Sequence, residues 1–121
     1  MGAAMELIPY TFVILRRPAT APDLPVEELD RLQERHLAHL TAMRANGSML
    51  LSGPLVDQPE ESWRGFCLYR TSIEETRRLA ADDPSVVAGR LSLEYFNWLM
   101  PDGNILNRAL LTGMLPGWDV G

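Results

Sequence analysis

The sequence predicts one α+β domain with a ferredoxin-like βαββαβ order, in which two helices cover one face of a four-stranded antiparallel sheet. Three observations support this fold class. Segments typical of strands and of amphipathic helices follow one another in the order strand, helix, strand, strand, helix, strand. The length of 121 residues fits a single compact domain, and a hydrophobic fraction of 46% is enough for a core.

The first strand and the first helix have the clearest signals. Residues 10–15 are rich in aromatic and β-branched side chains, and a connector rich in proline and alanine follows them. A helix is then expected from Val26 to about Asn46. Pro25 suits its first position, acidic residues complement the positive end of its dipole, and Asn46-Gly47 stops it.

The later elements are shorter and are bounded by turn signals. Gly53-Pro54 ends the second strand, and Ser72 with Glu75 forms a capping box at the start of the second helix. The run Asp82-Asp83-Pro84-Ser85 breaks that helix. The expected elements are a strand over 48–53, an exposed loop over 56–64, a strand over 65–70, a helix from Ser72 to about Ala81 and a strand over 91–98.

The domain is expected to occupy residues 1–99, and residues 100–121 form a C-terminal extension. Within it, residues 104–115 could form a short amphipathic helix and Trp118 offers a large apolar anchor. This extension is expected to pack on the domain or on a partner subunit. One sheet face has no helix over it, so a self-complementary dimer that stacks two sheets is the economical solution, although a half-solvated sheet is also possible.

Charge and cysteine content narrow the classes of partner and compartment. With 16 acidic against 11 basic residues the net charge is −5 and no continuous basic stripe is evident, so nucleic acid is a poor candidate partner. The single cysteine, Cys67, excludes an intrachain disulfide and suggests a buried strand position in a reducing cytoplasm. No apolar stretch is long enough for a membrane span, so a soluble cytoplasmic protein is expected.

His36 is the residue that most suggests chemistry. On a helix with about 100° per residue it falls near the centre of an apolar arc about 80° wide, which would aim the imidazole at the core. Imidazole titrates near working pH, so a partly buried one can exchange protons if a partner orients it. The alternative is a core histidine satisfied by a hydrogen bond. The arc consists of Leu29, Leu32, His36, Leu40 and Met43.

Asp83 is the candidate partner. Read locally, it is an N-cap with Pro84 at the first position of a one-turn helix, which needs no function. A resemblance to a known family favours a functional role for Asp83. The runs Arg35-His36-Leu37-Ala38-His39-Leu40, Gly47-Ser48-Met49-Leu50-Leu51-Ser52-Gly53-Pro54-Leu55 and Asp82-Asp83-Pro84-Ser85-Val86-Val87-Ala88-Gly89 resemble the YCII-related (YciI-like) domain family, with its helix histidine, Gly-Pro-Leu strand end and Asp-Pro.

The resemblance covers residues 10–98 and implies a ferredoxin-like fold, a dimer through the sheet faces and similarity to muconolactone-isomerase-type dimeric α+β barrels. It implies that His36 and Asp83 form a catalytic dyad. A few relatives of that family remove chloride from a chlorinated hydroxyquinol. A carboxylate that accepts one imidazole N–H fixes the tautomer and leaves the other nitrogen to move a proton, and such chemistry needs no cofactor.

Other residues are weaker candidates. His36 and His39, with Glu34 or Asp83, could hold a metal, although we expect none. Ser52 could donate a hydrogen bond to a ligand, or simply end a strand. Arg16 and Arg17 could hold an anionic group, or be solvated charges. Trp98 or Trp118 could form a pocket wall. The expected substrate-binding residues are therefore Ser52, Arg16 and Trp98.

These observations favour a small, cofactor-independent enzyme, homodimeric or higher, that uses the dyad in an elimination, dehydration or isomerisation of a small cyclic or aromatic substrate. Lyase or isomerase chemistry is expected. The alternative is a non-catalytic dimeric binding or assembly module in which His36 and Asp83 form a structural hydrogen bond.

Overall fold

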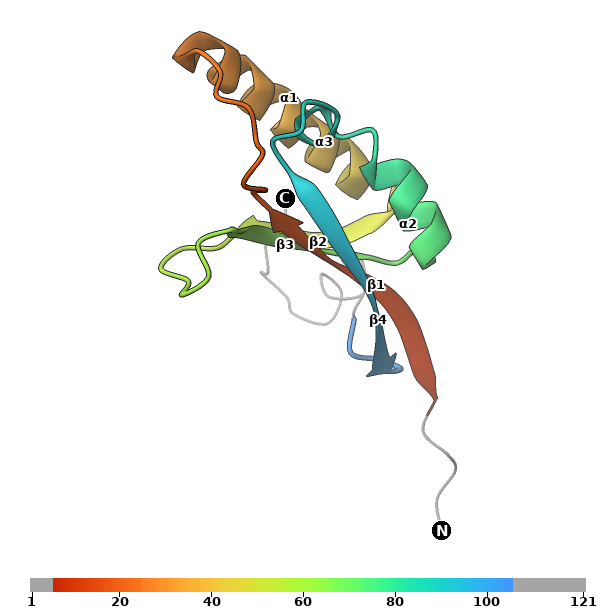
Figure 1. Cartoon of the computed structure of the whole chain (residues 1–121). Coiled ribbons are helices and arrows are strands. Elements are labelled where there is room, and N and C mark those ends of the chain that lie inside the picture. Colours follow the sequence, from red (N-terminus) through yellow and green to blue (C-terminus); the bar gives the residue numbers. More distant parts are fainter. Residues whose placement is uncertain (1–5, 106–121) are drawn as a thin grey trace, which may run out of the picture. The chain divides into compact units, whose positions relative to one another are not determined.

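A computed structural model describes residues 6–105 of the chain (Figure 1). Its element order confirms the expected succession of strands and helices, with one short helix added before the last strand. The elements are β1 (Leu7–Arg16), α1 (Val26–Ala45), β2 (Met49–Pro54), β3 (Trp63–Tyr69), α2 (Ile73–Ala80), α3 (Pro84–Val87) and β4 (Ser92–Pro101).

The strands form one four-stranded sheet in the order β2-β3-β1-β4. β3, one of the two inner strands, runs antiparallel to both β1 and β2. Figure 1 shows α1, α2 and α3 on the same side of this sheet. This arrangement confirms the α+β, ferredoxin-like fold class that the sequence predicts.

The chain divides into two compact units. The larger, Pro9–Trp98, contains the helices, most of the sheet and every site discussed below. In the smaller unit, which holds the outer ends of β1 and β4, the N–H of Asp102 donates to the carbonyl of Glu6 at 3.0 Å. Trp118, and all but the first two residues of the helix expected over 104–115, lie outside the described residues.

Helix α1 starts and ends close to where the sequence places it. Pro25 is the N-cap rather than the first helical residue, because its ψ of 152° is extended and the helix begins one position later, at Val26. At the other end Asn46 is the C-cap, and Gly47 follows with a φ of 83°. Only glycine adopts that left-handed conformation readily, which explains why the helix stops there.

The two shorter helices begin with side-chain caps. Ser72 Oγ accepts a hydrogen bond from the N–H of Glu75 at 3.2 Å, as the expected capping box requires. Asp83 caps α3, because its Oδ1 accepts from the N–H of Ser85 at 2.9 Å. Pro84 occupies the first turn of α3, where a missing N–H costs nothing.

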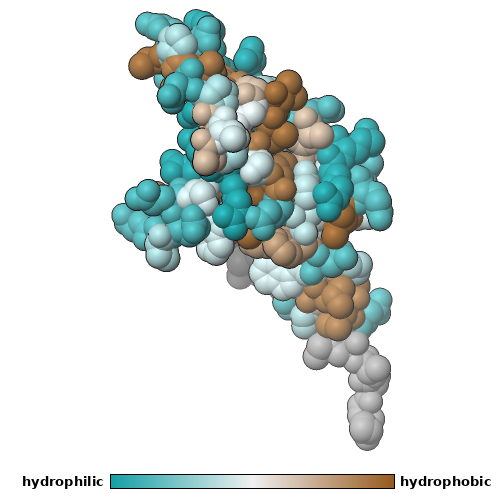
Figure 2. All heavy atoms as spheres, in the orientation of Figure 1, coloured by the Kyte–Doolittle hydropathy of each residue, from teal (hydrophilic) through white to brown (hydrophobic). Residues whose placement is uncertain are grey.

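The core lies between the helices and the sheet. Alternate residues of β1 and β3 point into it, and partly buried residues of α1 and β4 pack against them. Cys67 is buried there, as expected from the sequence. Figure 2 shows mostly hydrophilic residues over the segment between β2 and β3, which confirms the expected exposed loop. The buried core cluster consists of Val13, Leu15, Met49, Cys67, Tyr69 and Leu91.

Two irregularities in the sheet decide where particular side chains point. Met49 pairs with Tyr69 but Leu51 pairs with Leu68, so Leu50 is an extra residue in β2. Leu15 pairs with Gly65 but Arg16 pairs with Trp63, which leaves an extra residue, Arg64, in β3. An extra residue reverses the alternation of the side chains beyond it.

Candidate active site

His36 lies on the buried face of α1 and is 8% exposed. Leu32, one turn earlier, is the other buried residue of this helix, while Leu29, Leu40 and Met43 are partly buried. The apolar arc predicted from the sequence is therefore the face that docks on the rest of the domain. That docking takes the imidazole out of bulk solvent.

The imidazole of His36 meets the carboxylate of Asp83, although 47 positions separate them in the chain. His36 Nδ1 and Asp83 Oδ2 are 2.7 Å apart, and both side chains are largely buried. An ionised carboxylate only accepts hydrogen bonds, so Nδ1 carries the proton and its N–H donates a hydrogen bond to Oδ2. The N-cap role of Asp83 and its contact with His36 are both present, because each uses a different carboxylate oxygen.

A cavity of about 530 Å³ lies against His36. Its walls come from α1 and from the ends of β1, β2 and β3 that approach this helix, with Ser85 and Leu91 closing one side. Asp83 does not line this cavity; it stands behind the imidazole. Within residues 6–105 the imidazole of His36 forms a hydrogen bond through Nδ1 only, so Nε2 is the nitrogen left for a ligand in the cavity.

Ser52 lies on the wall of the His36 cavity, and the extra residue Leu50 is the reason. Ser52 pairs with Cys67, whose side chain faces the core, so Ser52 also points to the helix side of the sheet. Regular alternation from the buried Met49 would have turned it to the other side. Its hydroxyl accepts a hydrogen bond from Nη1 of Arg44 at 3.0 Å.

The structure does not bring Arg16 to this cavity. Arg16 forms an ion pair with Glu94, donates to Ser62 Oγ at 3.0 Å, and stacks on the ring of Trp63 at 5.6 Å. Its neighbour Arg17 points to the opposite side of the strand and does line the cavity, together with Arg44 and Arg64. Arg44 and Arg64 were not singled out in the sequence. Arg44 lies two turns after His36 on the same helix, so helical periodicity could have placed it beside the cavity. The position of Arg64 depends on a bulge, which the sequence does not indicate.

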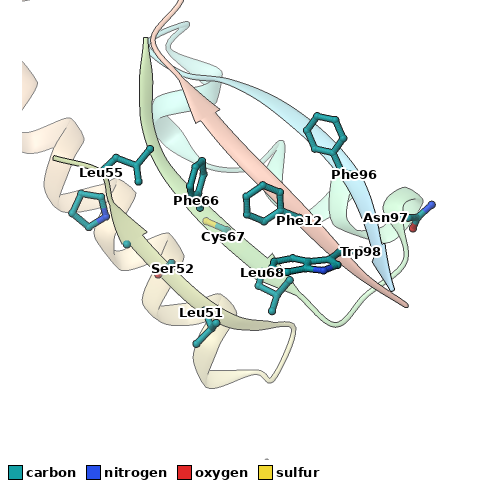
Figure 3. Close-up of a pocket in the computed structure, with 12 residues that line it drawn as sticks. Phe12, Leu51, Ser52, Leu55, Phe66, Cys67, Leu68, Phe96, Asn97 and Trp98 are labelled. Atoms are coloured by element: carbon teal, nitrogen blue, oxygen red, sulfur yellow. The ribbon is translucent and has the colours of Figure 1, made fainter. Parts of the chain in front are cut away.

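Trp98 belongs to a second cavity, of about 730 Å³, on the sheet face away from the helices. Figure 3 shows it beside Phe12 on this face. The two rings are 5.5 Å apart between centroids and nearly perpendicular, a favourable edge-to-face arrangement. The walls are almost entirely apolar; the large side chains are Phe12, Leu51, Leu55, Phe66, Leu68, Phe96 and Trp98.

His39 lies apart from the His36 cavity, on a small void of about 10 Å³ within the core. Its Nε2 is buried without a hydrogen-bond partner in the described part of the chain. No group of three or more His, Cys, Asp or Glu residues with the geometry of a metal site is found between residues 6 and 105. No described helix is long and apolar enough to cross a membrane.

The core beside His36 and Asp83 keeps two other acidic side chains protonated. Burial raises the pKa of the Cys67 thiol to about 12, and the nearby negative charge of Asp83 contributes in the same direction. Burial also raises the pKa of Tyr69, with smaller contributions from Cys67 and Asp83. Cys67 is therefore a neutral core residue, and a thiolate nucleophile is not available at neutral pH.

No family model matches the chain, and no curated protein matches it significantly. Among solved structures it is similar to 5-chloro-2-hydroxyhydroquinone dehydrochlorinase (TftG) from Burkholderia phenoliruptrix AC1100, in complex with 2,5-dihydroxybenzoquinone. The TM-score is 0.54 at 17% sequence identity, and the match covers 74% of this chain and 92% of the other. This likeness is one of fold. The structural neighbour is a small enzyme, named for its action on a chlorinated hydroquinone.

Proposed function

We propose that this protein is a small cofactor-independent enzyme in which His36 is the general base and acid and Asp83 is its orienting carboxylate. The substrate is a small cyclic or aromatic compound, and the reaction is an elimination, a dehydration or an isomerisation. The observation that carries the proposal is the buried contact between Nδ1 and Oδ2, with the imidazole on the wall of a cavity of about 530 Å³.

The arrangement supports proton transfer at Nε2. In an elimination Nε2 takes a proton, the freed electron pair forms a double bond, and the leaving group departs with its own electron pair. In an isomerisation the imidazolium returns the proton to another atom of the same substrate. In both reactions Asp83 stabilises the imidazolium and keeps its orientation. A cavity of this volume accommodates a single substituted ring.

Two further lines support the proposal. The sequence blocks around His36, Ser52 and Asp83 resemble the YCII-related family, for which such a dyad is expected. The structural neighbour TftG acts on a chlorinated hydroxylated ring. We propose that this chain belongs to the YCII-related family, that it acts in the cytoplasm and that Ser52 contacts the substrate. For Arg16 and Trp98 a substrate contact would have to involve the other sheet face, where both residues lie.

We further propose that a second copy of this chain covers the sheet face that carries Trp98. This face is apolar and has no helix over it within the described residues. A two-fold axis would place this aromatic face of one copy against the same face of the other. The resemblance to the YCII-related family supports the same pairing.

The experiment is a screen of the purified protein against hydroxylated and chlorinated quinols and quinones, 5-chloro-2-hydroxyhydroquinone included, that follows ring absorbance and chloride release. We expect turnover of at least one compound. His36→Gln should lower it about 10²- to 10⁴-fold, because the base is removed while a polar side chain of similar size remains. His39→Gln is the matched control, since His39 lies outside the cavity.

One observation supports the alternative, a binding or assembly module. The hydrogen bond between His36 and Asp83 also connects α1 to the start of α3, so it could serve structure alone. This alternative predicts that His36→Gln lowers the melting temperature strongly while no compound is converted. Turnover that survives in His36→Gln would overturn the catalytic proposal.

A further inference from the structure

The cavity beside His36 is cationic in a protein that carries a net charge of −5. Arg17, just after β1, Arg44 on α1 and Arg64 on β3 all line it. None of the described residues that line it is an aspartate or glutamate. Its remaining polar residues are Gln33, Thr41, Ser52 and Ser85, which are neutral.

Arg17 is held in place without neutralisation of its charge. Its Nε donates to the carbonyl of Arg90 at 2.7 Å, while its terminal amino groups have no partner in the described part of the chain. Burial lowers the pKa of Arg17, and the positive charges of Arg90 and Arg64 lower it further. The guanidinium groups therefore repel one another across this end of the sheet.

Arg44 and Arg64 are likewise oriented by neutral acceptors. Arg44 donates to Ser52 Oγ at 3.0 Å and to Thr41 Oγ1 at 3.5 Å. Arg64, the extra residue of the β3 bulge, donates to the carbonyl of Glu61 at 3.3 Å. In residues 6–105 none of the three cavity arginines forms an ion pair with a carboxylate, although other arginines do, as the pairs Arg16–Glu94 and Arg78–Glu75 show.

We propose that the His36 cavity binds an organic anion: a ring compound whose carboxylate or ionised enol oxygens are held by Arg17, Arg44 and Arg64 while its ring lies beside His36. Guanidinium groups hold such oxygens with charge-assisted hydrogen bonds, and the bound anion removes the repulsion among the arginines. The apolar part of the ring packs against Leu37 and Leu40. The proposal names the substrate class for the proposed function and rests on that function only for the catalytic role of His36.

The test compares ligands that are similar in size and shape, one carrying an anionic carboxylate and the other a neutral amide. Binding of benzoate and 2,5-dihydroxybenzoate is measured by calorimetry beside that of benzamide and 2,5-dihydroxybenzamide, up to millimolar concentration. We expect at least one acid to bind about tenfold or more tightly than its amide. Arg44→Gln and Arg64→Gln should each lower affinity for the acid about tenfold and leave affinity for the amide unchanged.

Arg31→Gln is the matched control, because Arg31 is exposed on α1 away from the cavity and its loss changes the net charge equally. Circular dichroism verifies that each variant is folded. Equal binding of acid and amide, no binding of any acid, or loss of the preference in Arg31→Gln would overturn the proposal. If inorganic phosphate binds as tightly as the acids, the site recognises charge without a ring, and the assignment to ring compounds is wrong.

The same measurements on His36→Gln separate this inference from the proposed function. The charge preference should persist in that variant, because the arginines remain. A preference for acids together with no turnover of any compound would leave the anion site standing and count against the enzyme. Turnover of neutral ring compounds alone would support the enzyme and overturn the anion site.

Discussion

Asp83 determines the tautomer of His36. Its Oδ2 accepts from the imidazole at Nδ1, and its Oδ1 accepts from the backbone N–H of Ser85, so both oxygens are engaged. Because a carboxylate cannot donate, the neutral imidazole carries its proton on Nδ1 and has a lone pair on Nε2. The residue that begins α3 thus fixes the chemical state of a side chain on α1.

Asp83→Asn should change the tautomer of His36 and leave the protein folded. An asparagine amide can keep only one of the two hydrogen bonds, which costs about 1–2 kcal/mol in the free energy of unfolding. If its carbonyl caps Ser85, its NH₂ faces Nδ1 and moves the imidazole proton to Nε2. Turnover of any substrate found should then fall about 10²- to 10⁴-fold.

Nitrogen NMR of the imidazole checks this without a substrate. We expect the proton of His36 on Nδ1 in the wild type and at least partly on Nε2 in Asp83→Asn. Asp82→Asn is the control, since Asp82 is exposed and the hydrogen bond of His36 is made to Asp83 instead. An unchanged tautomer together with an unchanged rate would show that Asp83 has no orienting role.

Gly65 is required by a close approach of two strands. A Cβ at this position would lie 2.6 Å from the carbonyl oxygen of Gly53 on β2, and a backbone atom cannot move aside cheaply. Gly65→Ala should therefore displace the end of β2, which forms part of the His36 cavity, and lower the free energy of unfolding by about 1–3 kcal/mol. Urea unfolding measures this loss.

Gly53→Ala is the matched control for that substitution. A Cβ on Gly53 meets nothing within 4 Å, so the free energy of unfolding should stay within about 0.5 kcal/mol of the wild type. Equal losses in the two variants would contradict the close approach between β2 and β3.

Cys67 should make the folded protein less stable at alkaline pH. Burial raises the pKa of its thiol to about 12 from an ordinary value of 9.0. Between these pH values the unfolded chain loses the proton and the folded chain keeps it, so the free energy of unfolding falls as pH rises above 9.0. Below that range the contribution of Cys67 is fully present.

The measurement is urea unfolding at several pH values from 8 upward, on the wild type and on Cys67→Ala. The free energy of unfolding should fall more steeply with pH in the wild type than in the variant. The variant lacks the Cys67 thiol, while Tyr69 and other groups still titrate. A thiol reagent at pH 8 should modify Cys67 only after unfolding. Rapid modification of the folded protein would contradict the burial of this thiol.

The apolar sheet face predicts an oligomer that a single charge disrupts. Trp98 is 49% exposed, so Trp98→Glu should not prevent folding of the monomer. It would bury two carboxylates at a two-fold interface, and we expect light scattering to show a dimer or higher oligomer for the wild type and a monomer for this variant.

Val87→Glu is the control for that experiment. Val87 is 75% exposed on α3, and the helices lie on the other side of the sheet, so the oligomer should persist in this variant. A monomeric wild type, or an oligomer that survives Trp98→Glu, would contradict the proposed interface.

Much of the fold follows from local signals. The Pro25 and Gly47 boundaries of α1, the Ser72 cap of α2 and the Asp83-Pro84 start of α3 depend on residues close in sequence, so their physics is visible in the chain. The inward position of His36 follows from helical periodicity alone. The element order was sufficient for the ferredoxin-like fold, which the structure confirms.

The pairing of strands decided which side of the sheet particular side chains face, which the sequence by itself did not indicate. Whether Ser52 faces the helices depends on the extra residue at Leu50, and the place of Arg64 in the cavity depends on a second one. Arg16 and Arg17 are adjacent in sequence, but only the sheet assigns Arg17 to the cavity and Arg16 to Glu94.

The sequence by itself determined the order of the elements, the approximate ends of the helices and the inward position of His36, because caps, turns and periodicity act over a few residues. Asp83 was named as the partner of His36 through the resemblance to a family. The tertiary structure decided that His36 and Asp83 meet and that three arginines surround the cavity beside them. The physical reason is that both depend on contacts between segments distant in the chain. His36 meets Asp83 because α1 packs beside α3, and Arg64 reaches the cavity because a bulge, whose position such contacts set, shifts the alternation of side chains in β3.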